Sequence, residues 1–150
     1  ARYASAIANG GIVYDAQIVD KIIAPDGTVV LDKQPVIANR INTNEAYFAA
    51  IKRGMEDVTS PEENGTAAKF YEGVKYIAAK TGTSQRTKLD VENNAWQVAY
   101  APLEDPQIVV VAYVQNAYTS PMIRTTIEYY LNHMNKTEST QMSGDYSLAD

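Results

Sequence analysis

Cysteine is absent from all 150 residues, and this one absence removes several kinds of chemistry. Without thiols the chain has no disulfide, no thiolate ligand for zinc and no cysteine nucleophile. Its acidic residues are scattered through predicted loops and helix ends, and it contains a single histidine. Because metal sites in proteins need clustered ligands, the sequence predicts no metal site and no cofactor.

Long hydrophobic runs and positive charge are also scarce. The longest apolar run, Ile108–Val114, is far too short to span a bilayer. The net charge is −5, from 13 Lys and Arg against 18 Asp and Glu, and no cluster of basic residues occurs. Nucleic-acid-binding surfaces are basic, so the sequence argues against a nucleic-acid partner.

What the chain does contain is the composition of a soluble globular domain, with 45% hydrophobic and 21% charged residues. Residues 1–8 predict a helix that begins at the first residue with no capping residue before it. Asn9-Gly10-Gly11 predicts the end of that helix. We interpret a helix with an end and no beginning as part of a longer, truncated protein.

The rest of the chain predicts an α+β fold in which helices flank an antiparallel sheet. A hairpin is expected over residues 17–32, around the turn Pro25-Asp26-Gly27. A helix is expected to begin around Asn42, because Asn42 and Glu45, three residues later, form a capping-box-like pair. The central strands are predicted at residues 74–83, 96–101 and 108–115, which are rich in β-branched and aromatic residues.

The C-terminal part of the chain predicts one more helix and then a tail. Ser120-Pro121 is typical of a helix start, with an N-cap residue and a proline at the first helical position. One apolar face follows at helical spacing: Ile123, Ile127, Tyr130, Leu131 and Met134. Residues 136–150 are polar and acidic, and we expect them to be disordered. The folded domain is therefore expected to occupy residues 1–135.

Residues 74–85 change character abruptly. Val74 to Ala79 are mostly apolar, as in a buried strand, and Lys80-Thr81-Gly82-Thr83 then supply a cation, hydroxyls and a glycine. A core strand gains nothing from these residues, because glycine weakens strands and a buried lysine is costly. Either the strand ends in a solvated turn, or it ends in a functional site.

The spacing of this stretch favours a site for a carboxylate. Side chains of an extended strand alternate between its faces, so Thr81 and Thr83 share one face while Lys80 and Gly82 share the other. Two hydroxyls so placed can donate to one carboxylate, and a nearby ammonium adds charge. If the strand lies at a sheet edge, its backbone can also pair with an extended peptide. The sequence therefore predicts a peptide-carboxylate site.

The stretch Ala79-Lys80-Thr81-Gly82-Thr83-Ser84-Gln85 resembles the KTG box of the penicillin-binding protein transpeptidases. That family of serine acyl-transfer enzymes also includes the serine β-lactamases. The resemblance covers residues 3–134 and implies the C-terminal part of a class B-like transpeptidase domain, with the penicillin-binding protein/serine β-lactamase-like fold. It extends to further segments in family order: Ala8-Asn9-Gly10-Gly11, Pro25-Asp26-Gly27, Gly54-Met55-Glu56, Gly65-Thr66-Ala67 and the run from Trp96 to Pro102.

The resemblance implies a role for each residue of the box. Lys80 would stabilise charge and assist proton transfer with a serine of the second family motif. Thr81 and Thr83 would hold the terminal carboxylate of a D-Ala-D-Ala stem peptide or of a β-lactam. The backbone N–H of Thr83 would form half of an oxyanion hole. Gly82 would allow a close backbone approach, and Ser84 and Gln85 would line the substrate groove.

The resemblance also implies partners and a location outside this chain. The substrate would be peptidoglycan, and the N-terminal part of the same domain and other cell-wall synthesis proteins would be partners. The parent protein would sit at the extracytoplasmic face of a bacterial cell membrane, anchored by an N-terminal helix that this chain does not contain.

Two motifs of the family are missing from this sequence. The nucleophile of Ser-x-x-Lys and the partner serine of Ser-x-Asn should both precede the KTG box, and neither occurs. Without a serine nucleophile and its base there is no covalent step, so the chain alone is expected to be inactive. The alternatives are a non-catalytic module that binds peptides or proteins along its exposed strand, and a penicillin-sensing or β-lactamase-like domain.

Overall fold

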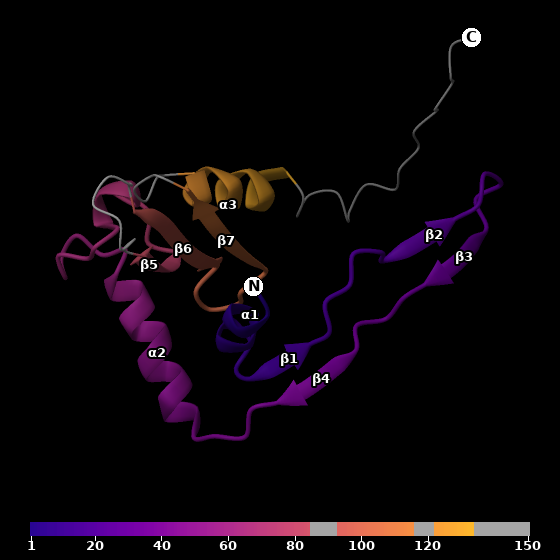
Figure 1. Ribbon diagram of the computed structural model, residues 1–150, viewed down its shortest axis with the longest axis horizontal. Coiled ribbons are helices and arrows are strands. Elements are labelled where there is room, and N and C mark those ends of the chain that lie inside the picture. The colour runs from indigo at the N-terminus through magenta and orange to yellow at the C-terminus, as the bar shows by residue number, and fades with distance from the viewer. Residues whose placement is uncertain (85–92, 116–121, 134–150) are drawn as a thin grey trace, which may run out of the picture.

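The computed structural model describes residues 1–84, 93–115 and 122–133. Helices and antiparallel strands combine in an α+β fold, as predicted (Figure 1). The elements, in chain order, are α1 (Arg2–Ala8), β1 (Ile12–Tyr14), β2 (Lys21–Ile23), β3 (Val29–Asp32), β4 (Ile37–Arg40), α2 (Glu45–Asp57), the 3-10 helix η1 (Ala68–Phe70), β5 (Ala78–Ser84), β6 (Asn94–Ala101), β7 (Ile108–Val114) and α3 (Met122–His133).

The central sheet has the strand order β5-β6-β7, with antiparallel pairing throughout. The three strands predicted for the centre of the domain are confirmed, but β5 begins at Ala78 rather than at residue 74. The preceding residues are held by other hydrogen bonds: the Val74 amide donates to Tyr71 O in a turn, and Ile77 O accepts from Thr59 Oγ1. These residues are therefore buried against the sheet without belonging to its ladder.

Each face of the central sheet is packed against helices (Figure 1). On one face, here called the α3 face, Ala79 and Ala99 pack with Ile123 and Ile127 of α3. The opposite face, here called the α2 face, packs through Ala78 and Tyr100 against α1 and α2. Alanines at the sheet positions let the helices approach closely, so the strand that carries the candidate site is held from both sides.

The helices follow the predicted positions with one correction. Helix α1 ends at the predicted glycines, with Gly10 and Gly11 at positive φ. Helix α2 begins close to the expected position, but the expected capping role of Asn42 is wrong: Asn44 is the N-cap, and its Oδ1 accepts a hydrogen bond of 2.9 Å from the Ala46 amide. Asn44 is better placed because its side chain reaches an amide of the first turn, whereas Asn42 lies two residues further out.

In α3 the predicted apolar face is confirmed at Ile123 and Ile127, which are buried. Other predictions made for this end of the chain fall outside the described residues: the Ser120-Pro121 cap, Met134 and the tail over residues 136–150. None of the helices in the described ranges combines the length and the apolar character needed to cross a membrane.

Residues 12–40 form a long hairpin, here called the arm, that extends away from the rest of the molecule (Figure 1). The predicted hairpin over residues 17–32 is confirmed as the β2–β3 pair at its outer end. Nearer the body β1 pairs with β4, a strand that the sequence pattern did not reveal. Arg2 ties the arm to α1 through Tyr14 O and Asp15.

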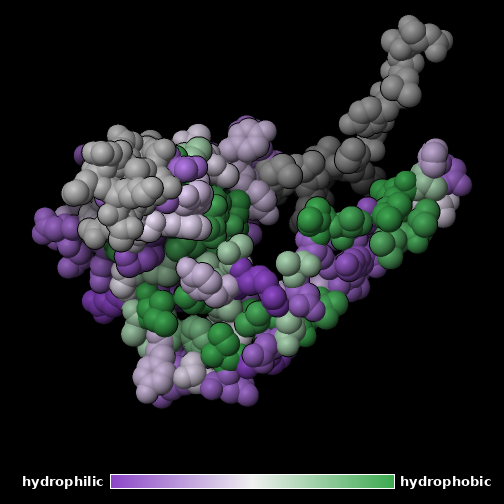
Figure 2. Space-filling view, viewed as in Figure 1, coloured by the Kyte–Doolittle hydropathy of each residue, from purple (hydrophilic) through white to green (hydrophobic). Residues whose placement is uncertain are grey.

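The outer arm exposes apolar side chains, visible as green atoms along it in Figure 2. The exposed members there are Ile18, Val19, Ile22, Ile23, Val29, Val30 and Leu31. An isolated pair of strands is marginally stable in water, and exposed apolar patches mark interaction surfaces. The arm is therefore the part of the described molecule that depends least on the central core.

Two buried tyrosines in the core differ in how their hydroxyls are satisfied. Tyr71 Oη accepts a hydrogen bond of 2.8 Å from Gln97 Nε2, and both side chains are buried. Tyr100 is equally buried, but among the described residues its hydroxyl has no hydrogen-bond partner. Burial raises the pKa of each phenol to about 12.

This difference predicts opposite outcomes for the same substitution. Tyr71→Phe should lower the free energy of unfolding by about 1–3 kcal/mol, because it leaves the buried Gln97 amide without an acceptor. Tyr100→Phe removes a hydroxyl that has no described partner and should be neutral or slightly stabilising. Urea unfolding followed by circular dichroism measures both. Equal losses in the two variants would show that the Tyr71–Gln97 bond contributes nothing.

Candidate active site

The predicted site residues lie next to one another at the end of β5. Lys80, Thr81, Gly82, Thr83 and Ser84 are consecutive residues of that strand, and Ser84 is its last residue. Gln85, predicted to line the same groove, falls outside the described residues. The strand is buried at its start and opens to solvent along the site: Lys80, Thr83 and Ser84 are exposed, while Thr81 and Gly82 are half-buried.

The pairing register fixes which side chains share a face. Thr81 lies opposite Gln97 and Thr83 opposite Ala95, so both threonines are on the α3 face. Lys80 lies opposite Val98 and is therefore on the α2 face with Gly82. The predicted separation of the two hydroxyls from the lysine is confirmed. The hydroxyls and the ammonium flank the same strand from opposite sides.

The outer edge of β5 carries backbone groups that point away from β6. Lys80 Nζ donates to Thr81 O at 2.7 Å, and Thr59 Oγ1 donates to Ile77 O at 2.9 Å. Because backbone groups of a strand alternate in direction, the N–H of Thr83 points to the same edge as these two carbonyls. No strand among residues 1–84, 93–115 and 122–133 pairs with this edge.

Thr66 contacts the site from a distant part of the sequence. Its Oγ1 lies 2.9 Å from Thr81 Oγ1, and either hydroxyl can be the donor. Sequence reasoning assigned no function to Thr66, although Gly65-Thr66-Ala67 was part of the family resemblance. The one hint in the sequence is the glycine before it, since glycine permits a close approach of two backbone segments. In the structure, a Cβ at Gly65 would overlap the backbone oxygens of Asp57 and Val58. That close approach brings Thr66 to the strand.

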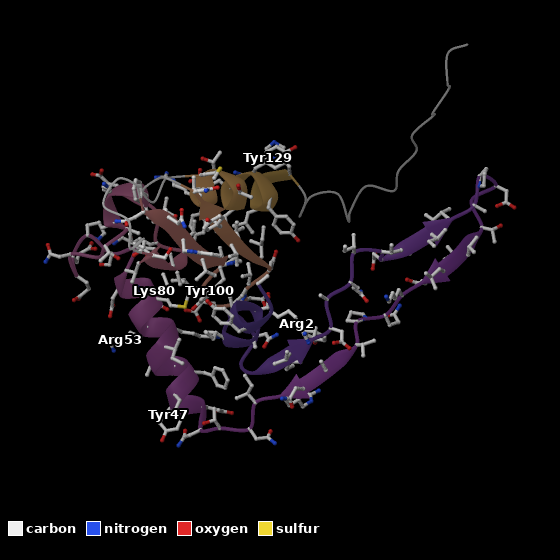
Figure 3. The ribbon with its side chains drawn as sticks, in the orientation of Figure 1. Arg2, Tyr47, Arg53, Lys80, Tyr100 and Tyr129 are labelled. Carbon is white, nitrogen blue, oxygen red and sulfur yellow. The ribbon has the colours of Figure 1, made fainter. Side chains whose placement is uncertain are left out.

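The α2 face beside Lys80 presents an aromatic pair. The Trp96 and Tyr113 rings lie with their centroids 4.5 Å apart, and both side chains are about half exposed. Trp96 is directly opposite Gly82 in the ladder, and a Cβ on Gly82 would sit 3.4 Å from Trp96 Cβ. In Figure 3, Lys80 and Tyr100 lie on the side of α1 and α2, away from Tyr129 on α3. The lysine and the aromatic pair therefore lie on the same face of the sheet.

A separate cavity of about 730 Å³ lies along α2 and does not include the KTG residues. Its lining carries charges of both signs, with Lys52, Arg53 and Lys75 set against five acidic residues, so it offers no net attraction for an anion. The acidic residues are Glu56, Asp57, Glu62, Glu63 and Glu104. The described residues that the sequence predicts to bind a carboxylate lie on β5, and none of them lines this cavity.

Comparison with known proteins finds relatives of this chain. The peptidoglycan D,D-transpeptidase MrdA of Haemophilus influenzae is 32% identical over 120 residues, covering 67% of this chain and 18% of the relative. Penicillin-binding protein 2A of Bacillus subtilis is 32% identical over 133 residues, covering 79% of this chain and 18% of the relative. This chain therefore spans about a fifth of the length of these relatives.

A solved structure has the same arrangement of elements. The imipenem acyl-enzyme complex of penicillin-binding protein A from M. tuberculosis matches with a TM-score of 0.70 and 27% identity, covering 87% of this chain and 29% of that one. The family model described as penicillin binding protein transpeptidase domain matches residues 1–130, from α1 into α3. The edge strand with its Lys-Thr-Gly-Thr sequence thus lies within a chain that belongs to the penicillin-binding protein transpeptidase domain family.

Proposed function

We propose that this chain supplies one wall of the acyl-transfer site of a serine-type peptidoglycan D,D-transpeptidase. The observation that carries the proposal is the arrangement at β5: two threonine hydroxyls on one face, an exposed lysine on the other, and between them a backbone edge that no strand of the described residues covers. These three kinds of group can together recognise a peptide that ends in a carboxylate.

Each group then has a distinct task in the proposed reaction. Thr81 and Thr83 hold the terminal carboxylate of a D-Ala-D-Ala stem peptide, or that of a β-lactam, through their hydroxyls. The N–H of Thr83, on the outer edge, donates to the oxyanion that forms when the carbonyl is attacked. Lys80 stabilises negative charge on the α2 face and assists proton transfer there. Gly82, Ser84 and Gln85 line the substrate groove.

The nucleophile and its base come from another part of the same polypeptide. No Ser-x-x-Lys or Ser-x-Asn motif suited to these roles occurs in the 150 residues, so the N-terminal part of the transpeptidase domain provides them and this chain alone is inactive. The relative from M. tuberculosis forms an acyl-enzyme with imipenem, which supports a covalent mechanism. The complete protein acts at the extracytoplasmic face of the membrane, held by a helix outside this chain.

A second candidate is a non-catalytic peptide-binding module, and the edge of β5 that pairs with none of the described strands favours it as well. Such a module would add an extended peptide to the strand through backbone hydrogen bonds. It would need neither Lys80 nor a nucleophile. The two functions therefore differ in whether a covalent bond to a β-lactam ever forms.

Fluorescent penicillin labelling separates these functions. The chain alone should give no covalent adduct by mass spectrometry, and a polypeptide extended to include Ser-x-x-Lys and Ser-x-Asn motifs should be acylated, because only then is a nucleophile present. An adduct on the chain alone would place a nucleophile within it and contradict the proposal. An extended polypeptide that carries both motifs and resists acylation would favour the peptide-binding module.

A further inference from the structure

The loop before η1 is fastened to the end of α2 on both sides of Thr66. The Gly65 amide donates to Ser60 O at 2.9 Å, and the Ala67 amide donates to Val58 O at 3.0 Å. Ala67 is fully buried in the core cluster of the α3 face. Thr66 therefore has little freedom to move, even though its own side chain is exposed.

The same segment of the chain is also hydrogen-bonded to β5 and to the residue before it. Thr59, at the end of α2, donates to Ile77 O just before the strand, and Thr66 Oγ1 meets Thr81 Oγ1 at 2.9 Å four residues further along. These two hydroxyl contacts connect the segment from Thr59 to Thr66 with β5. They place Thr66 beside the Thr81 side chain.

A hydroxyl has one proton to donate and two lone pairs, so only one of the two threonines can donate within the pair. If Thr81 donated to Thr66, its proton would be unavailable to a substrate. If Thr66 donates to Thr81, the proton of Thr81 stays free to reach a carboxylate, and the two bonds in series strengthen one another. An incoming carboxylate selects the second arrangement.

We propose that Thr66 is a positioning residue for carboxylate recognition: it donates to Thr81 and so directs the proton of Thr81 toward the substrate carboxylate. The inference rests on the proposed function of Thr81. It adds a residue from a different loop to the site, and it predicts that loss of the Thr66 hydroxyl weakens recognition of the carboxylate without disturbing recognition of the rest of the substrate.

The test measures the second-order acylation rate constant of the transpeptidase polypeptide that contains this chain. Each variant is assayed with a penicillin and with the methyl ester of the same penicillin. Thr66→Val should lower the rate with the free acid by about tenfold and leave the rate with the ester unchanged. Thr66→Ser, which keeps the hydroxyl, should restore the rate. Thr125→Val, at an exposed position of α3, is the matched control and should change neither rate.

The outcomes separate this inference from the function on which it rests. If Thr81→Val also lowers the ratio of acid to ester rates, and Thr66→Val has no further effect in that background, the two hydroxyls act as one unit. If Thr81→Val leaves the ratio unchanged, the carboxylate role of Thr81 fails. If Thr81→Val changes the ratio and Thr66→Val does not, only the role of Thr66 fails. If Thr66→Val lowers the acylation rates with the acid and with the ester equally, the cause is a structural defect and the inference is overturned. Thr66→Ala provides the same comparison if the valine variant does not fold.

Discussion

Replacing Lys80 with alanine in the transpeptidase polypeptide that contains this chain is expected to reduce penicillin acylation by about 10²–10⁴-fold. The side chain is exposed on the α2 face, and its ammonium lies at the outer edge of β5, 2.7 Å from Thr81 O. Alanine removes the only charge on the candidate strand and leaves the backbone edge in place. The loss should therefore appear in the rate of acylation and not in the melting temperature.

Lys75→Ala is the matched control for this prediction. Lys75 precedes the same strand and is also exposed, but its contact is a 3.8 Å ion pair with Glu62 at the surface. Such pairs contribute little to stability, so this variant should be acylated at the parental rate. Stopped-flow measurement with a chromogenic β-lactam compares the two variants. Acylation of Lys80→Ala at the rate of Lys75→Ala would show that the lysine is wrongly assigned.

The second large effect concerns stability and comes from Gly65→Ala. A Cβ at this position would overlap the backbone oxygens of Asp57 and Val58, at the end of α2. Neither carbonyl can move away without distorting the end of the helix. Val58 O also accepts a hydrogen bond from the Ala67 amide. Overpacking of this kind should lower the free energy of unfolding by about 1–3 kcal/mol.

Gly54→Ala is the corresponding control, because it makes the same chemical change in open space. Gly54 lies inside α2, and nothing stands within 4 Å of the Cβ it would gain. Alanine in a helix interior is better than glycine by about 0.8–1.0 kcal/mol, so this variant should be more stable than the parent. Differential scanning calorimetry of both variants measures the contrast. A Gly65→Ala protein as stable as the parent would mean that the loop can move away from α2, and Thr66 with it.

The candidate strand could be predicted from sequence because its signal is local. A run of apolar residues that turns into Lys80-Thr81-Gly82-Thr83 is unusual for a core strand, and the period of two assigns the faces without further information. The pairing register agrees with that assignment. The packing of both faces of the strand depends on α1, α2 and α3, and its place at the edge of the described sheet depends on the order β5-β6-β7. Neither feature could be read from the stretch itself.

Features that depend on distant contacts were missed or misplaced. Strand β4 contains Asn39 and Arg40 and follows Pro35, so its sequence pattern does not resemble a strand. The residues are extended because they pair with β1, although their own β-propensity is low. The cap of α2 was assigned to Asn42 on motif spacing, although Asn44 makes the hydrogen bond. The sequence predicts no function for Thr66, because its contact with Thr81 joins residues that are fifteen positions apart.

The arm has a consequence for how this protein can vary in length. The turn at its tip is held by short-range hydrogen bonds, from the Ala24 amide to Thr28 O and from the Thr28 amide to Asp26 Oδ1. An insertion there would replace only this turn, and the entropic cost of a longer loop grows slowly with its length. Exposed turn tips are also where inserted domains are best tolerated. The tip is thus a natural attachment point, where a reporter or a newly acquired segment can be added at a distance from β5.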